Sequence, residues 1–332
     1  MKKKHKWGRL NQKWVEPDVR DSIINYIGKI QSLTEIKLNK LFKMIGISKN
    51  KYYDWYSRLE KPNNHNGQIP KQHWLLDWER EAIINYAKNN SEQGYRRLTY
   101  MMIDDDIVAV SPSTTYRVLS SVDLLNKWNK GKTSSKGNGF TQPTKCHQHW
   151  HTDIKYVNFK GTFLFLISVI DGYSRYIVHH ELRMSMQEFD VQLTLERALE
   201  KFPNVKPRII SDNGSQFISK DFHDYLRFVG LQHIRTSIAY PQSNGKIERY
   251  HKTINGECLQ KQSFINLEDA RNQINKYVDF YNTKRLHSSL FYLTPVDFLN
   301  GSVEEKLRIR QNKLNQAKLN RFKTKIVIQD FN

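Results

Sequence analysis

The chain of 332 residues contains only two cysteines, Cys146 and Cys258, and no long apolar segment. So few cysteines cannot build a disulfide framework, which favours a protein of the reducing cytoplasm. Because a transmembrane helix needs about 20 predominantly apolar residues, the sequence predicts no membrane span. The basic residues 1–14 are followed by no apolar stretch, so we expect no secretory signal.

Acidic residues are also scarce. The chain has 33 Asp and Glu against 53 Lys and Arg, which gives a net charge of +20. Such an excess predicts a polyanionic partner, namely DNA, RNA or an anionic membrane. A membrane is the least favoured of the three, because no segment combines an apolar stripe with a wholly basic face. At about 100–200 residues per domain, the length predicts two or three domains.

Positive charge is concentrated in two segments. Residues 126–149 hold five lysines and no acid, and they are rich in Gly, Ser, Thr and Asn. We interpret residues 130–147 as a basic, flexible linker, in which Lys130 and Lys132 are candidate DNA contacts. Residues 305–325 carry eight Lys or Arg against one Glu. This basic tail fits either a solvated helix or tail, or a DNA contact, and the sequence leaves both open.

The chain before the linker is predicted to be all-helical. Apolar residues recur with helical spacing on both sides of Gly46-Ile47-Ser48. A short turn with glycine between two helices is typical of a helix-turn-helix, and Ser48 fits an N-cap. An ordinary helical hairpin has the same pattern, but the net charge favours DNA binding, and we assign residues 1–62 to this domain. The candidate DNA contacts in its second helix are Lys49, Asn50, Lys51 and Tyr52.

Residues 63–129 resemble a second helix-turn-helix domain. Ser111 fits an N-cap, and Pro112 fits the first turn of the helix that follows. The acidic run Asp104-Asp105-Asp106 is a poor metal site, because consecutive acids at a helix end cannot all face one ion. The candidate DNA contacts here are Arg96, Arg97, Ser113, Thr114, Thr115 and Arg117.

After the linker the pattern changes to strands. Residues 150–182 contain three strand-like runs separated by Lys160-Gly161 and Asp171-Gly172, and helices then alternate with short strands. This order predicts an α/β domain with a mixed sheet over residues 148–260. We expect a helical C-terminal region with the basic tail over residues 261–332.

Three carboxylates stand out against this background. Asp153 lies inside an apolar strand-like run. Asp212 lies at the carboxyl end of the apolar run 208–211, and Glu248 lies in the first turn of a predicted helix. A buried carboxylate is costly unless it is paired, hydrogen-bonded or bound to a metal, and ligand sites gather at the carboxyl ends of strands. Exactly 35 residues separate Asp212 from Glu248. Converging carboxylates repel one another, which points to divalent cations such as Mg²⁺ between them.

Five segments together carry a resemblance to a known family. These are HTDIKYV, LISVIDGYSR, IISDNGSQFIS, SIAYPQSNGKIERYHKTI and YNTKRLHSSLFYLTPVDF, in this order, within residues 90–300. The chain resembles the integrase-core transposases of bacterial insertion sequences, and within them the group called the IS-three family. The family's aspartate-aspartate-35-glutamate triad falls on Asp153, Asp212 and Glu248.

The resemblance implies a ribonuclease-H-like core with a five-stranded mixed sheet, preceded by the helix-turn-helix units. It implies two Mg²⁺ or Mn²⁺ ions and metal-dependent cleavage and strand transfer at transposon ends. The expected partners are double-stranded DNA at the ends and the target, further copies of the chain in at least a dimer, and a separate upstream-frame product as a further candidate. The expected location is the bacterial cytoplasm, associated with the nucleoid.

Some residues depart from the family pattern or have a second interpretation. Many relatives carry Lys or Arg seven residues after the glutamate, where this chain has Asn255, although Lys252 remains on that face. The residues Cys146, His147, His149 and His151 suit a zinc site poorly, because alternate side chains of one strand do not make a closed tetrahedron. Further candidate DNA contacts are Lys246, Arg249, Lys252 and Arg285.

Two other functions share much of this sequence evidence. A DNA-binding regulator without catalysis would not need all three carboxylates, and a nuclease of the same fold would cut without end specificity or joining.

The segment Pro241-Gln242-Ser243-Asn244-Gly245 before Glu248 is rich in turn-forming residues. We interpret it as a hinge that places Glu248 when DNA is bound.

Overall fold

The computed structural model describes residues 7, 10, 15, 17–61, 74–125, 142–236 and 244–330. The chain forms two compact units, Met1–Trp74 with Thr324–Asn332 and Leu75–Lys323. No helix within the described ranges is both long and apolar enough to cross a membrane.

The first unit contains three helices, α1 (Pro17–Leu33), α2 (Leu38–Ile45) and α3 (Lys49–Tyr56). Helix α2 ends at Gly46, whose φ of 75° is a left-handed conformation that glycine adopts without steric cost. Helix α3 begins after Ser48, whose hydroxyl accepts a hydrogen bond from the Lys51 amide, as the sequence predicted. The apolar faces of the three helices meet in one buried core.

The second unit begins with another set of three helices, α4 (Asp77–Asn89), α5 (Tyr95–Asp104) and α6 (Pro112–Ser120). The Ser111 hydroxyl caps α6 by accepting the Thr114 amide, and Pro112 lies in its first turn, which confirms the predicted helix start. Their apolar residues form a separate core. We call α4–α6 the second helical module.

A five-stranded mixed sheet, as expected for the core, follows in the order β3-β2-β1-β4-β5. Strands β1 (His149–Phe159), β2 (Thr162–Asp171) and β3 (Ile177–Arg183) are antiparallel, whereas β4 (Arg208–Ser211) and β5 (His233–Arg235) extend the sheet in parallel. The β1–β2 hairpin turns at Lys160 and Gly161, which both have positive φ, as a two-residue turn that matches strand twist requires.

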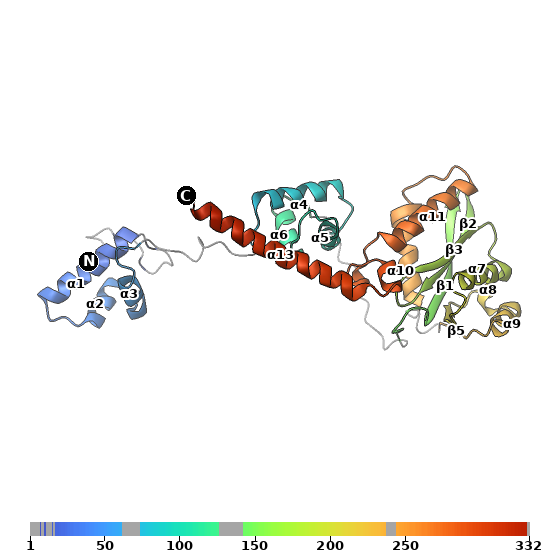
Figure 1. Ribbon diagram of the computed structural model, residues 1–332, viewed down its shortest axis with the longest axis horizontal. Helices are drawn as coiled ribbons and strands as arrows, with labels where there is room; N and C mark the ends of the chain where they lie inside the picture. The colour runs from blue at the N-terminus through green and yellow to red at the C-terminus, as the bar shows by residue number, and fades with distance from the viewer. Residues whose placement is uncertain are drawn as a thin grey trace. The chain divides into compact units, whose positions relative to one another are not determined.

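Helices cover both faces of the sheet (Figure 1). On one face lie α7 (Glu188–Lys201), α8 (Ser215–Ile218) and α9 (Lys220–Phe228). On the other face lie α10 (Gly245–Ile254), the π-helical turn η2 (Asn255–Leu259) and α11 (Leu267–Thr283). The chain ends with η3 (Ser288–Leu290), α12 (Pro295–Leu299) and α13 (Val303–Asp330), so the predicted helical C-terminal region is confirmed.

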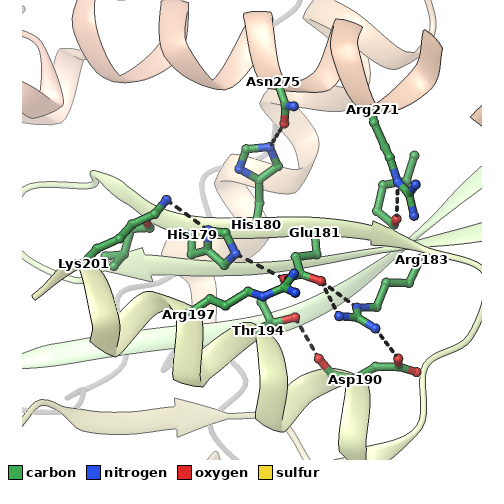
Figure 2. A network of polar contacts seen from close by, with 12 residues as sticks. His179, His180, Glu181, Arg183, Asp190, Thr194, Arg197, Lys201, Arg271 and Asn275 are labelled. Carbon is green, nitrogen blue, oxygen red and sulfur yellow. Dashed lines mark hydrogen bonds and ion pairs between the residues drawn. The ribbon is translucent and has the colours of Figure 1, made fainter. Parts of the chain in front are cut away.

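The edge strand β3 is held to α7 by a network of charged side chains. Figure 2 shows Glu181 between His179, Arg183 and Arg197, with Arg183 also donating to Asp190. Burial raises the pKa of Glu181, but hydrogen bonds from His179, Arg197 and Arg183 outweigh it and lower the pKa to about 2. Charged side chains on an edge strand also disfavour pairing with another chain.

Part of the predicted linker belongs to the core instead. The amide of His147 donates to the Asp171 carboxylate at 2.7 Å, and the Cys146 thiol donates to the Phe298 carbonyl at 3.4 Å. These bonds attach Cys146 and His147 to the core, so the end of the predicted linker is not flexible at these two residues. Residues 126–141, with Lys130 and Lys132, lie outside the described residues.

Asp171 organises the turn between β2 and β3. Its buried carboxylate accepts from the amides of His147, Tyr173 and Ser174 and from the Ser174 hydroxyl, at 2.7, 3.2, 2.7 and 2.7 Å. The sequence assigned Asp171 to a turn, and this is confirmed. In the same turn, Arg175 donates to the Gly172 carbonyl.

Replacing Asp171 with alanine is expected to destabilise the core by about 2–4 kcal/mol, because several buried donors lose their acceptor. Chemical denaturation followed by fluorescence measures this difference. The control is Asp224→Ala, which removes an exposed carboxylate from α9 and should change stability by less than about 0.5 kcal/mol. Equal, small effects of both substitutions would contradict the role given to Asp171.

Candidate active site

Two of the three predicted carboxylates lie at neighbouring positions of adjacent strands. In the parallel pair, His151 of β1 is opposite Ile210 of β4, and Asp153 and Asp212 each follow two residues later. The Asp153 Oδ1 accepts from the Ile154 amide at 2.8 Å, and the Asp212 Oδ1 accepts from the Gly214 amide at 2.9 Å. The sheet register therefore brings the two aspartates together.

The pKa of Asp212 is raised mainly by desolvation and to a smaller extent by the nearby Asp153. Although the residue as a whole is exposed, surrounding protein withdraws water from the carboxylate, and this raises its pKa. The bond from the Gly214 amide lowers the pKa, and the negative charge of Asp153 raises it again. A Cβ at Gly214 would lie 3.1 Å from the Asp212 Oδ1, so glycine leaves room around this carboxylate.

The third carboxylate, Glu248, lies on another element. It is exposed in the first turn of α10, a helix that packs against β1. Within the described ranges, no group of three or more His, Cys, Asp or Glu side chains lies close enough to hold one metal ion. Glu248 is thus not gathered with the two aspartates. Residues 241–243 of the predicted hinge lie outside the described residues.

Two side-chain contacts attach α10 to β1 beside the aspartates. The Nδ1 atom of His251 lies 3.4 Å from the Asp153 Oδ2, and the Nδ1 atom of His151 lies 3.3 Å from the Asn244 Oδ1. His251 is three residues after Glu248, so both project from the same side of α10. Neither His251 nor Asn244 was among the site residues predicted from the sequence, although the helical spacing from Glu248 was a signal for His251.

Asp153 and Asp212 are suitable ligands for a divalent cation. Carboxylate oxygens are hard donors that suit Mg²⁺ and Mn²⁺. A cation beside them would favour the charged form of Asp212, whose pKa is raised first by desolvation and then by the charge of Asp153. The side chains of the Cys146–His151 segment make packing and polar contacts within the protein and do not form a metal site with one another. Its thiol faces Phe298, the His147 ring packs on Phe202, and His151 faces Asn244.

The candidate DNA contacts fall into groups by exposure. Exposed side chains belong to Lys49, Asn50, Arg96, Ser113, Arg117, Arg249 and Lys252. Half-buried ones belong to Lys51, Arg97, Thr114 and Lys246. Among these, Lys51 donates to the Leu10 carbonyl, and burial followed by the charge of Arg175 lowers the pKa of Lys246 to about 7.

Three of the candidates are buried and are better explained by packing. The ring of Tyr52 lies 4.9 Å from that of Phe42 in the core of the first unit. The hydroxyl of Thr115 lies 2.8 Å from that of Thr99. The guanidinium of Arg285 donates twice to Glu257, at 2.7 and 2.6 Å. The expected DNA contacts at these positions are corrected accordingly, because each side chain points toward the interior of its module.

Family models, two transposases and a solved integrase structure are similar to this chain. Two family models described as Integrase core domain match residues 143–241 and 229–295. The chain is 33% identical over 243 residues to the transposase for insertion sequence element IS904 of Lactococcus lactis, covering 66% of the chain and 94% of that protein. It is 22% identical to the putative transposase InsK for insertion sequence element IS150 of Escherichia coli, covering 79% and 93%. The HTLV-2 integrase catalytic core domain in complex with magnesium is similar over 47% of the chain and 97% of that structure, at 18% identity and a TM-score of 0.38.

Three histidines that are shielded from water, the buried His151 and the half-buried His180 and His233, predict a loss of stability in mild acid. Burial, followed by the charge of Lys246, lowers the pKa of His151 to about 3, and burial lowers those of His180 and His233 to about 4. In the unfolded chain these groups titrate near pH 6.5, so the stability is present above that pH and is lost as the pH falls toward 4.

Each such group contributes a slope of at most about 1.4 kcal/mol per pH unit. Denaturation curves between pH 7 and pH 4.5 should show the free energy of unfolding decreasing, with a smaller slope in His151→Asn. The slope is the readout, since this substitution also lowers the absolute stability. Equal slopes in the two proteins would contradict the assignment.

Proposed function

The chain belongs to the integrase-core transposases of bacterial insertion sequences, and on that premise we propose that it binds the terminal inverted repeats of its element and performs DNA strand cleavage and strand transfer there. The observation that carries the proposal is the placement of Asp153 and Asp212 at matching positions of parallel strands. A pair of like charges in this position is most stable with a cation beside it.

Asp153, Asp212 and Glu248 are the residues that would hold two Mg²⁺ or Mn²⁺ ions. When bound, such ions stabilise the attacking and leaving oxygens of a phosphodiester. The amides of Ile154 and Gly214 orient the two aspartates, and His251 contacts the remaining oxygen of Asp153. Glu248 would join them as the first turn of α10 engages the substrate.

The reaction needs no covalent protein intermediate. Water first cleaves the phosphodiester at the transposon end and releases a 3′-hydroxyl. That hydroxyl then attacks a phosphodiester of the target, so that one bond forms as another breaks. The exposed Arg249 and Lys252 and the half-buried Lys246 lie on α10 with Glu248, where they are suited to hold DNA phosphates.

The helical modules would supply recognition of the ends. Helices α3 and α6 each follow a serine-capped turn, and exposed polar or basic side chains stand near their starts. Because two DNA ends must be joined to one target, we propose that the active assembly contains at least two copies of the chain. A separate upstream-frame product is a further candidate partner, and we propose the nucleoid of the cytoplasm as the site of action.

The catalytic assignment predicts the behaviour of Glu248→Gln. Cleavage and joining of a labelled end duplex with Mg²⁺ should fall on the order of 10²-fold or more, because a metal ligand supplies several kcal/mol of transition-state stabilisation. The matched control is Glu268→Gln, an exposed glutamate in the first turn of α11, which should leave both steps unchanged. Wild-type activity in Glu248→Gln would show the triad to be wrong. Cutting without joining in the wild-type chain would favour a nuclease.

DNA recognition by α6 predicts the behaviour of Arg117→Ala. Affinity for the end duplex should fall by about tenfold, as expected for a contact of about 1–3 kcal/mol, when measured at fixed salt. Lys88→Ala removes the same charge from the exposed surface of α4 in the same module. Similar losses in both variants would mean that net charge, rather than α6, governs the binding.

A further inference from the structure

The long C-terminal helix α13 binds the second helical module through Arg310. This side chain is 6% exposed, and its guanidinium donates to both carboxylate oxygens of Asp104, at 2.8 and 2.5 Å. Asp104 is the last residue of α5. A two-bond pair of this kind fixes direction as well as distance.

The same guanidinium also holds a turn that follows the catalytic core. Arg310 donates to the carbonyls of Phe291 and Tyr292, at 3.2 and 2.7 Å. Both of these residues have left-handed backbone, with φ of 52° and 57°. Large side chains rarely adopt this conformation, and here it presents two successive carbonyl oxygens to one cation.

Aromatic rings add to the contact between the second helical module and the turn at residues 291–292. The Tyr100 ring of α5 stacks on that of Tyr292, with centroids 4.8 Å apart and planes at 17°. The Arg310 guanidinium carbon lies 4.9 Å from the centre of the Tyr100 ring. Arg310 therefore joins α13, the second helical module and the turn at residues 291–292 at a single point.

Two more basic residues continue this attachment along α13. Lys313 donates to the Ile103 carbonyl at 2.9 Å and pairs with Asp106 at 2.7 Å. The buried Arg321 donates to both oxygens of Glu79 at 2.9 Å. Steps of three and eleven residues from Arg310 place all three on one side of the helix.

These contacts give a role to two sequence features that the proposed function does not use. Two members of the acidic run, Asp104 and Asp106, accept from α13, and the third, Asp105, accepts from the Tyr86 hydroxyl. Part of the positive charge of the basic tail is thus neutralised within the protein. In Figure 1, α13 runs alongside α4–α6, as these bonds require.

We propose that Arg310 is a positioning residue that determines where the transposon end is cut. This inference rests on the proposed function, in which α6 binds the end sequence and the carboxylates cut it. Successive phosphates of a strand are about 3.4 Å apart along the duplex axis. A displacement of the module by that distance would present the neighbouring phosphodiester, so a fixed spacing selects one bond.

A lysine at position 310 cannot replace the arginine. Its single ammonium group lacks the planar fork that binds Asp104 by two parallel bonds while also reaching two carbonyls. Arg310→Lys therefore keeps the charge and weakens the fixed spacing, and Asp104→Asn weakens it from the other side. Arg308→Ala is the matched control, because Arg308 is an exposed arginine on the same helix.

The test uses the full chain and a defined probe, the duplex that the wild-type chain selects from a randomised library. The labelled duplex is incubated with Mg²⁺, and its cuts are mapped at single-nucleotide resolution. Wild type and Arg308→Ala should cut at one position. In Arg310→Lys and Asp104→Asn the share of cuts at that position should fall by about twofold or more, with new cuts at adjacent nucleotides.

A second measurement needs no DNA activity. Nitroxide labels on Ser120→Cys of α6 and Lys220→Cys of α9, with Cys146 and Cys258 replaced, report the spacing by double electron–electron resonance. The distance distribution should be narrow in wild type and Arg308→Ala and broader in Arg310→Lys. Unchanged cut positions in Arg310→Lys would overturn the proposal, as would an unchanged distribution.

The map of cut positions and the label distances distinguish a failure of this inference from a failure of the proposed function. If the wild-type chain makes no cuts, the proposed function fails and the cutting role of Arg310 fails with it. The label distances still decide in that case whether Arg310 holds the spacing. If the wild type cuts at one position and the variants do too, the transposase function stands and the inference alone is wrong.

Discussion

The parallel pairing of β1 with β4 is the constraint on which the rest of the candidate site depends. The parallel pairing of β1 and β4 sets the two carboxylates at matching positions, and buried Trp150, Ile209 and Ile210 hold those strands in register. Removal of water from the Asp212 carboxylate is the main reason that its pKa is raised, and the negative charge of Asp153 adds to this. A fold that moved the two side chains apart would lose the site that we propose for a divalent ion.

The third carboxylate depends on a different part of the fold. Helix α10 is attached to β1 by His251 at Asp153 and by Asn244 at His151, on either side of Glu248 in the sequence. Glu248 itself remains exposed between these contacts. In the proposed mechanism, the sheet would supply a pair of metal ligands, and Glu248 would join them when metal and DNA bind.

Local signals in the sequence predicted much of the fold. Ser48, Ser111 and Pro112 marked helix starts correctly, and alternating strands and helices predicted the mixed sheet, because these features depend on nearby residues. The sequence predicted that Asp153 and Asp212 converge, but their matching positions depend on the pairing of β1 with β4, which is a long-range contact without a local signal. Composition could not decide which basic residues face solvent.

Because exposure could not be predicted from composition, some of the predicted DNA contacts fell on buried side chains. Tyr52 and Thr115 were selected with their sequence neighbours, but consecutive residues of a helix point in different directions, and these two point inward. The guanidinium of Arg285 donates a hydrogen bond to Glu257. That of Arg310 donates to Asp104, which is 206 positions away in the sequence. Pairings at such separation have no local signature, so the basic tail could not be divided into internal and external charges from the sequence.

The most direct test of the central claim is anomalous diffraction from Mn²⁺ in crystals of the full chain bound to an end duplex. The account predicts manganese beside both Asp153 and Asp212, with the Glu248 carboxylate drawn into the same site. Manganese bound elsewhere, or a Glu248 that stays in solvent while the two aspartates hold metal and DNA, would contradict it.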